Sequence, residues 1–193
     1  TNAIVPTLKV LNDEFDIQSG HIESVHSYTN NQNLIDNFHK KVRRGRSAAL
    51  NMVITETGAG KAVGQVLPEL QGKLTANAVR VPTPNVSLAI INLRFAKDIT
   101  LEELNDFLRQ KAFHSDLKEQ IGFTNSPEVV STDFVGDRHA GIIDSAATIV
   151  NGNKCVLYVW YDNEFGYTAQ LLGLAKEMVG LTYQRYPNFS EST

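Results

Sequence analysis

Residues 142–160 read IIDSAATIVNGNKCVLYVW and join two apolar, strand-like runs through Asn151-Gly152-Asn153. An Asn-Gly pair between apolar runs is a strong local signal of a β-hairpin, because both residues tolerate the backbone angles of a tight turn. The sequence therefore predicts strands over 142–150 and 154–160 that pair antiparallel. A further strand-like run covers 129–135.

Apolar residues recur at helical spacing in four other segments. The clearest follows Thr100-Leu101-Glu102-Glu103, a capping box in which the threonine and glutamate side chains satisfy backbone N–H groups at a helix start. Gly180 stands just past the last segment, a common position for glycine at a helix end. We expect the four helices to begin at or before Thr1, after Thr57-Gly58, at Thr100 and at Gly166, the last covering 166–179.

The remaining patterns predict further strands. Residues 21–29 alternate in polarity, and 76–95 hold two apolar runs separated by Pro82-Thr83-Pro84-Asn85, where prolines would interrupt a central strand. Strands mixed with helices, without a repeat or an interior linker, predict a single α+β domain with a mostly antiparallel mixed sheet and helices on one face. We assign residues 1–180 to this domain and 181–193 to a C-terminal tail.

Composition excludes several classes of protein. Of 193 residues, 42% are hydrophobic, enough for a sizeable core, and the formal net charge is −3. A net charge of −3 gives no sign of a general nucleic-acid-binding surface, so any site that binds an anion must be local. No apolar run reaches about 18 residues and no basic-apolar leader opens the sequence, so neither a membrane span nor a signal peptide is expected. The single cysteine excludes an internal disulfide and fits a reducing cytoplasm.

Basic residues crowd into one part of a long polar loop, residues 30–48. Five lysines and arginines fall within 40–46 with no acid among them. This run is either a solvated basic loop or an anion site in which an arginine forks onto phosphate oxygens. Thr57-Gly58 supplies a hydroxyl and a backbone N–H at a helix start, which suits a phosphate but also a plain helix start. Gly58-Ala59-Gly60-Lys61 lacks the upstream glycine and the hydroxyl residue after lysine that define a nucleoside-triphosphate loop, which we exclude.

Histidine and cysteine, which often carry catalysis, occur singly on predicted strands. His26 is a candidate general base because imidazole titrates near neutral pH, although a lone histidine is more often structural. Cys155 lies in a core-like strand with no neighbour to lower its pKa, so an inert thiol is expected. Tyr161-Asp162-Asn163-Glu164 ends that strand as either a ligand site or a helix cap. Histidines and carboxylates show no metal-ligand spacing, so we expect no metal site.

Taken together, six segments resemble the C-terminal catalytic domain of phosphorylating glyceraldehyde-3-phosphate dehydrogenases, and the likeness runs from Thr1 to about Val179. They occur in the order that the family has. The segments are Val25-His26-Ser27-Tyr28-Thr29, Arg43-Arg44-Gly45-Arg46, Thr57-Gly58-Ala59-Gly60-Lys61-Ala62-Val63, Val79-Arg80-Val81-Pro82-Thr83-Pro84-Asn85-Val86, Val130-Ser131-Thr132-Asp133-Phe134 and Trp160-Tyr161-Asp162-Asn163-Glu164-Phe165-Gly166-Tyr167.

The resemblance implies the fold of that domain and one half of a two-part enzyme. Family members carry Ser-Cys-Thr-Thr-Asn where this sequence opens with Thr1-Asn2, so the nucleophilic cysteine would precede Thr1 by two residues. Cys155 belongs to a different strand and cannot replace it. The nucleotide-binding half would lie further upstream, and we expect this chain alone to be inactive.

The family reaction converts glyceraldehyde 3-phosphate, inorganic phosphate and NAD or NADP to 1,3-bisphosphoglycerate through a cysteine thioester. Family members are cytoplasmic homotetramers, and the same is expected of the complete protein, with the coenzyme bound mostly by the absent half. Carried over residue by residue, the resemblance implies His26 as the catalytic base and imidazolium partner of the thiolate, Thr29 and Arg80 as ligands of the substrate phosphate, Arg44, Thr57 and Gly58 as ligands of inorganic phosphate, and Asn163 and Tyr167 beside the nicotinamide.

Two alternatives stay open. An erythrose-4-phosphate dehydrogenase domain is disfavoured because Thr57-Gly58 and Val81-Pro82-Thr83-Pro84-Asn85 look like the glyceraldehyde-phosphate type. A non-catalytic phosphate-binding or assembly module is motivated by the missing nucleophile. The preference for NAD or NADP depends on residues outside this sequence.

Overall fold

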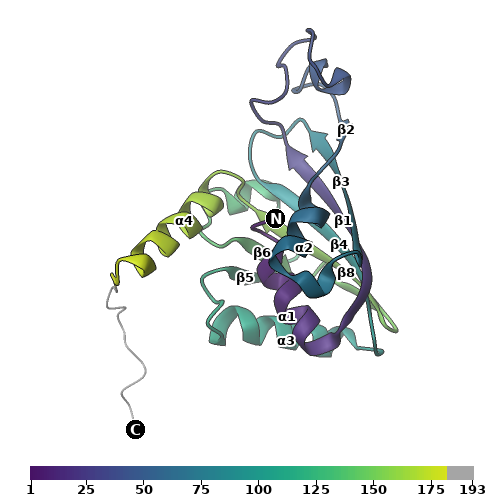
Figure 1. Cartoon of the computed structure of the whole chain (residues 1–193), viewed down its shortest axis with the longest axis vertical. Coiled ribbons are helices and arrows are strands. Elements are labelled where there is room, and N and C mark those ends of the chain that lie inside the picture. The colour runs from purple at the N-terminus through teal and green to yellow at the C-terminus, as the bar shows by residue number, and fades with distance from the viewer. Residues whose placement is uncertain (182–193) are drawn as a thin grey trace.

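The computed structural model describes residues 1–181, so of the predicted tail over 181–193 all but Leu181 lies outside the described residues. Within them, eight strands form one mixed sheet in the order β2-β3-β1-β4-β8-β6-β5, with β7 paired to β8 (Figure 1). The strands are β1 Ile17–Ser27, β2 Val53–Thr55, β3 Leu74–Val81, β4 Ser87–Phe95, β5 Ile121–Thr124, β6 Gly141–Asp144, β7 Ile149–Asn151 and β8 Lys154–Tyr161.

The central strand β1 lies between two strands that follow one another in the sequence. It pairs parallel with β3 and antiparallel with β4, so the loop containing Pro82 and Pro84 passes over the end of β1. The backbone N–H of Tyr28 donates to the Thr83 carbonyl there, at 3.2 Å. The only other parallel pair in the described sheet is β5 with β6, so the prediction of a mostly antiparallel mixed sheet is confirmed.

Three helices cover one face of this sheet. Buried side chains of α1 (Val5–Phe15), α2 (Ala59–Val66) and α3 (Leu101–His114) share a single core cluster with alternate residues of β4. The fourth helix, α4 (Phe165–Met178), extends away from the sheet (Figure 1) and buries only Gly166. None of these helices is both long enough and apolar enough to span a bilayer, for residues 1–181.

Local signals for turns and caps are confirmed. Thr100 Oγ1 accepts the Glu103 N–H at 3.1 Å, and Glu103 Oε2 accepts the Thr100 N–H at 3.5 Å, which completes the capping box of α3. Gly152 forms the β7–β8 turn with φ of 60°, and Gly180 follows α4 with φ of 68°, both in the left-handed region that favours glycine. The sequence rules work here because each involves residues only a few positions apart.

Two strand predictions are wrong. Residues 131–134 form a 3-10 turn instead of a strand, because Asp133 Oδ2 accepts the Val130 N–H at 2.7 Å and Phe134 stacks on Trp160 at 5.6 Å between ring centroids. Residues 142–150 are two strands, since the Asp144 side chain accepts the Trp160 Nε1–H at 3.0 Å and the Ala147 N–H at 3.2 Å, which turns the chain after β6.

Other boundaries shift. Helix α1 begins at Val5 rather than at Thr1: the Thr1 carbonyl accepts the Ile4 and Val5 N–H groups in a preceding turn, but Pro6 has no N–H to continue that bonding. Strand β1 begins at Ile17, four residues before the predicted start. Strands β2 and β5 have three and four residues, too few to show a period, and were not predicted.

Substitutions in α3 test how much the shared core stabilises the domain. Leu108 is fully buried, so Leu108→Ala is expected to lower the free energy of unfolding by about 2–5 kcal/mol through lost burial and a residual cavity. Leu101 lies on the same helix but is 44% exposed, and Leu101→Ala is expected to cost less than about 1 kcal/mol. Urea unfolding of both variants measures the difference. Equal losses would contradict the packing described here.

Candidate active site

A polar cluster begins where the core-facing side of β1 ends. Ile22 and Ser24 are buried on that side, and His26 follows them at the same two-residue spacing. His26 pairs with Arg80 across β1 and β3, and Arg80 pairs with Val53 across β3 and β2. The sheet register therefore brings together two predicted site residues that are far apart in the sequence.

His26 is fixed through one ring nitrogen. Its Nδ1 lies 2.8 Å from the Ser27 carbonyl oxygen and 2.7 Å from Arg80 Nη1. Arg80 Nη1 also donates to the Ser27 carbonyl at 3.0 Å, and the Tyr161 ring meets the imidazole edge to face at 6.0 Å. With Nδ1–H donating to the Ser27 carbonyl, the ring's lone pair lies on Nε2, and nothing among residues 1–181 hydrogen-bonds to it, so Nε2 is the nitrogen available to accept a proton.

The surroundings of His26 keep its ring neutral. Burial is the main reason that its pKa falls to about 4, and the charge of Arg80 lowers it further. A neutral ring can accept a proton at physiological pH. The imidazolium implied by the family resemblance would need a nearby thiolate, whose negative charge raises the pKa again.

Arg44 brings a second guanidinium to the cluster. It lies in the 3-10 turn Val42–Gly45, is 9% exposed, and donates to Thr55 Oγ1 from Nε at 3.2 Å and from Nη2 at 2.9 Å. Burial lowers the pKa of Arg80, and the charge of Arg44 lowers it further, so the two guanidiniums are close enough to repel each other. No carboxylate pairs with either within residues 1–181. Two poorly solvated cations without an acid partner favour the binding of an anion.

A pocket of about 640 Å³ lies beside Arg44, and both Arg44 and Thr57 line it. Thr57 Oγ1 accepts the Ala59 N–H at 3.2 Å at the start of α2. Gly58, between them, is exposed, and no heavy atom lies within 4 Å of where a Cβ would stand. Two of the three residues predicted to bind inorganic phosphate, Arg44 and Thr57, therefore line one cavity, and Gly58 directly follows Thr57 in the chain. Thr29, predicted to bind the substrate phosphate, is held by a backbone contact: its carbonyl accepts the Gln32 N–H at 3.0 Å.

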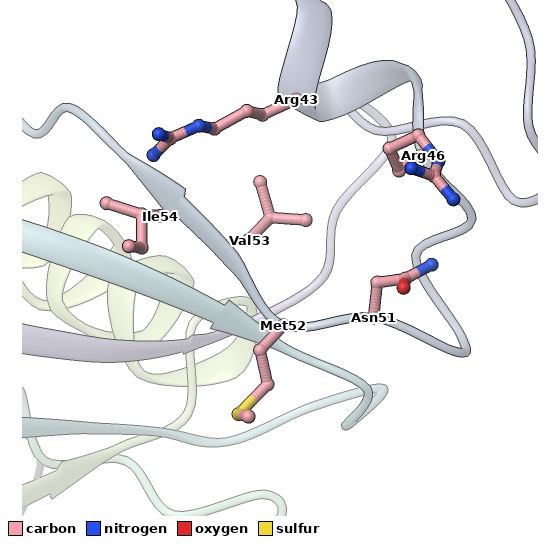
Figure 2. A pocket seen from close by; sticks show the side chains of 6 residues that line it. All are labelled: Arg43, Arg46, Asn51, Met52, Val53 and Ile54. Carbon is pink, nitrogen blue, oxygen red and sulfur yellow. The ribbon is translucent and has the colours of Figure 1, made fainter.

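A second hollow of about 280 Å³ lies on the loop that carries Arg44. Figure 2 shows its lining, with Arg43 extending over Ile54 on one side and Arg46 beside Asn51 on the other. Arg46 Nε pairs with Asp36 at 3.2 Å, so its charge is already partly neutralised. Arg43 and Arg46 are thus exposed on the loop, whereas Arg44 of the same basic run is buried.

Asn163 is tied to the strand that carries His26. Its Nδ2 donates to Ser27 Oγ, and the Ser87 hydroxyl donates to its Oδ1. Both serines are almost fully buried, and the Ser27 N–H also donates to Ser87 Oγ at 3.1 Å. The amide keeps one N–H and one oxygen lone pair unused, which fits the carboxamide of a nicotinamide ring. Tyr167 lies on α4 and is 58% exposed.

Asp162 connects two segments of the cluster, whereas the sequence left its segment as either a ligand site or a helix cap. Its carboxylate accepts the backbone N–H groups of Gly136, Glu164 and Phe165 and the Asn85 amide, at 2.8–3.0 Å. Burial opposes ionisation, but these four donors outweigh it and lower the pKa of Asp162. The start of α4 and the loop after β3 are therefore fastened at one point. Sequence reasoning assigned no individual role to Thr55, Ser27, Ser87, Tyr161 or Asp162.

Cys155 lies in β8 within the core, 3% exposed, and burial raises the pKa of its thiol to about 12. Iodoacetamide is therefore expected to leave Cys155 unmodified in the folded chain at mildly alkaline pH and to alkylate it fully in guanidinium chloride, because only the thiolate reacts. Intact mass before and after denaturation measures this. Rapid alkylation of the folded chain would contradict the inert role.

Comparison with known proteins gives the same family throughout. A family model described as "Glyceraldehyde 3-phosphate dehydrogenase, C-terminal domain" matches residues 1–163. The chain is 63% identical over 187 residues to a glyceraldehyde-3-phosphate dehydrogenase-like protein of Pseudomonas aeruginosa, covering 97% of this chain and 41% of the relative. It is 46% identical over 177 residues to glyceraldehyde-3-phosphate dehydrogenase of Priestia megaterium, covering 91% and 52%. The chain spans about half the length of the curated relatives it matches.

Proposed function

Because the chain belongs to the glyceraldehyde-3-phosphate dehydrogenase family as its C-terminal domain, we propose that it is the catalytic domain of a phosphorylating dehydrogenase that oxidises glyceraldehyde 3-phosphate. The observation that carries this proposal is the pair of Arg44 and Arg80 near the neutral base His26. Within residues 1–181, neither of these two cations has a carboxylate partner. The reaction needs these elements, since it uses two phosphate groups and one proton acceptor.

The position of Thr1 supports a nucleophile upstream. Its backbone nitrogen lies near the His26 ring. A cysteine two residues before Thr1 would stand near His26, ahead of helix α1, whose dipole favours a thiolate there. The thiolate attacks the aldehyde carbon, and the His26 imidazolium that pairs with it gives its proton to the resulting alkoxide, which yields a thiohemiacetal. His26 Nε2 then takes the proton of its hydroxyl as the carbon is oxidised to a thioester.

The two arginines would serve the two phosphates. We assign Arg80, with Thr29, to the phosphate that the substrate carries, and Arg44, Thr57 and Gly58 to the inorganic phosphate that cleaves the thioester to an acyl phosphate. A bound nicotinamide dinucleotide, NAD or NADP, supplies the hydride acceptor. The free N–H and lone pair of Asn163 would hold its carboxamide, with Tyr167 alongside the ring.

The exposed apolar side chains support assembly with further protein. Leu171, Leu172 and Leu174 on α4 are more than half exposed, and so are Phe38 and Val42 on the long loop. Such surfaces commonly mark protein contacts. We propose that α4 packs against the nucleotide-binding half and that the complete protein is a cytoplasmic homotetramer.

Steady-state kinetics of the complete protein that contains this chain test the proposal. Reduction of NAD or NADP is expected with glyceraldehyde 3-phosphate, to depend on inorganic phosphate, and to be slower with erythrose 4-phosphate. The chain of 193 residues alone is the control and should show no turnover. A wide preference for erythrose 4-phosphate would replace the substrate assignment. Phosphate binding without turnover of either aldehyde would leave a non-catalytic binding module.

A further inference from the structure

The Arg44 guanidinium is held along one edge by a single hydroxyl. Nε and Nη2 form the side edge of a guanidinium, and both donate to Thr55 Oγ1, at 3.2 Å and 2.9 Å. Arginine has five N–H donors in a flat fork, so the end edge formed by Nη1 and Nη2 stays free for a second acceptor. Thr55 therefore determines which edge of Arg44 is offered to a ligand.

The contact between Thr55 and Arg44 also opposes the repulsion between the Arg44 and Arg80 guanidiniums. Arg44 and Arg80 are close enough that the charge of one lowers the pKa of the other. Within residues 1–181, Thr55 Oγ1 is the only hydrogen-bond acceptor of the Arg44 guanidinium, which is 9% exposed. Without that acceptor, two N–H groups of a buried cation would lose their partner, and the side chain would be free to turn away from Arg80.

Thr55 is well placed to act at the phosphate pocket. It ends the short strand β2, pairs with Ala78 of β3, and lines the same pocket as Arg44 and Thr57. Guanidinium nitrogens only donate, so the hydroxyl hydrogen of Thr55 is not used by Arg44 and is available to an anion. One side chain thus orients a cation and adds a donor beside it.

We propose that Thr55 is a positioning residue for inorganic phosphate, which holds Arg44 so that its end edge binds the oxyanion that cleaves the thioester. The inference rests on the proposed function. It makes Thr55 specific to the phosphate-dependent half of the reaction, because the steps that form the thioester use His26 and Arg80 instead. Thr55 lies outside the segments that carry the family resemblance and in a strand too short to be predicted.

Kinetics of Thr55→Val in the complete protein test the proposal. Valine keeps the shape but removes the acceptor, so the KM for inorganic phosphate is expected to rise about tenfold or more, as when a hydrogen bond to a charged group is lost. The KM for glyceraldehyde 3-phosphate and the burst of reduced coenzyme without phosphate should change less than about twofold. Thr55→Ser restores the hydroxyl and should return the KM for phosphate to within about threefold of the wild type.

Two matched variants make the outcomes separable. Thr75→Val removes a threonine hydroxyl from neighbouring β3 that contacts His21 instead of Arg44, and should leave both KM values unchanged. Arg44→Leu tests the phosphate site itself. If Arg44→Leu raises the KM for phosphate and T55V does not, the inference on Thr55 is overturned while the proposed function stands. If Arg44→Leu also has no effect, the phosphate site is wrong. Should T55V fail to fold, Thr55→Ala carries the same expectations.

Discussion

Replacing His26 by asparagine in the complete protein is expected to lower kcat by about 100- to 10,000-fold, the usual contribution of a general base. Asparagine keeps a polar group near the Ser27 carbonyl and Arg80 but cannot take up a proton. The KM for glyceraldehyde 3-phosphate should stay within about threefold of the wild type, because the arginines that face the phosphates remain. Initial rates over a range of substrate and pH measure both effects.

His21 supplies a matched control for this substitution. It lies on the same strand, and its two ring nitrogens contact Thr75 and Asn77 at 2.8 Å, outside the cluster. His21→Asn should therefore leave kcat within about twofold of the wild type. A folded His26→Asn protein with nearly normal kcat would show that His26 is not the base.

Replacing Arg80 by glutamine is the second large effect, with an expected loss of about 100- to 1,000-fold in kcat/KM for glyceraldehyde 3-phosphate. The loss should shrink to less than about threefold with unphosphorylated glyceraldehyde, because the proposed ligand of Arg80 is then absent. Arg94→Gln, an exposed arginine on β4, is the control and should change neither rate. Equal losses with both aldehydes would contradict the assignment of Arg80 to the substrate phosphate.

Arg80→Gln also changes the titration of His26. The guanidinium charge is one of the causes that lower the pKa of His26 to about 4, although burial is the larger one. The pKa should therefore rise in the variant, and the acid limb of the pH profile should move to higher pH. In the wild-type protein, His26 is protonated between pH 4 and 6.5 mainly when the chain is unfolded. The free energy of unfolding therefore falls as the pH drops through that window. The variant should lose less stability there, which urea unfolding measures.

Short-range rules predicted much of the fold. The capping box at Thr100, the turn at Gly152 and the glycine after α4 each depend on neighbours in the sequence, and each is confirmed. The strand predicted over 129–135 is wrong: Phe134 stacks on Trp160, which lies on β8, while Val130 and Val135 are exposed, so the apolar residues do not share one strand face. A local pattern cannot reveal a contact made across the sheet.

The candidate site depends more heavily on long-range pairing. His26 and Arg80 meet because β1 and β3 run parallel with these residues in register, which no spacing rule shows. The family resemblance named both residues, but not Thr55, whose importance comes from the edge of Arg44 that it occupies. Likewise Asp162, whose segment the sequence left as either a ligand site or a helix cap, also holds the loop after β3 through Asn85.

The most direct test of the account is to locate the acyl group. The complete protein is mixed with glyceraldehyde 3-phosphate and coenzyme without inorganic phosphate, quenched in acid and digested, and the modified peptide is identified by mass spectrometry. We expect a 3-phosphoglyceryl thioester on a cysteine just upstream of Thr1, with Cys155 unmodified. An acyl group on Cys155, or none while coenzyme is reduced, would contradict it.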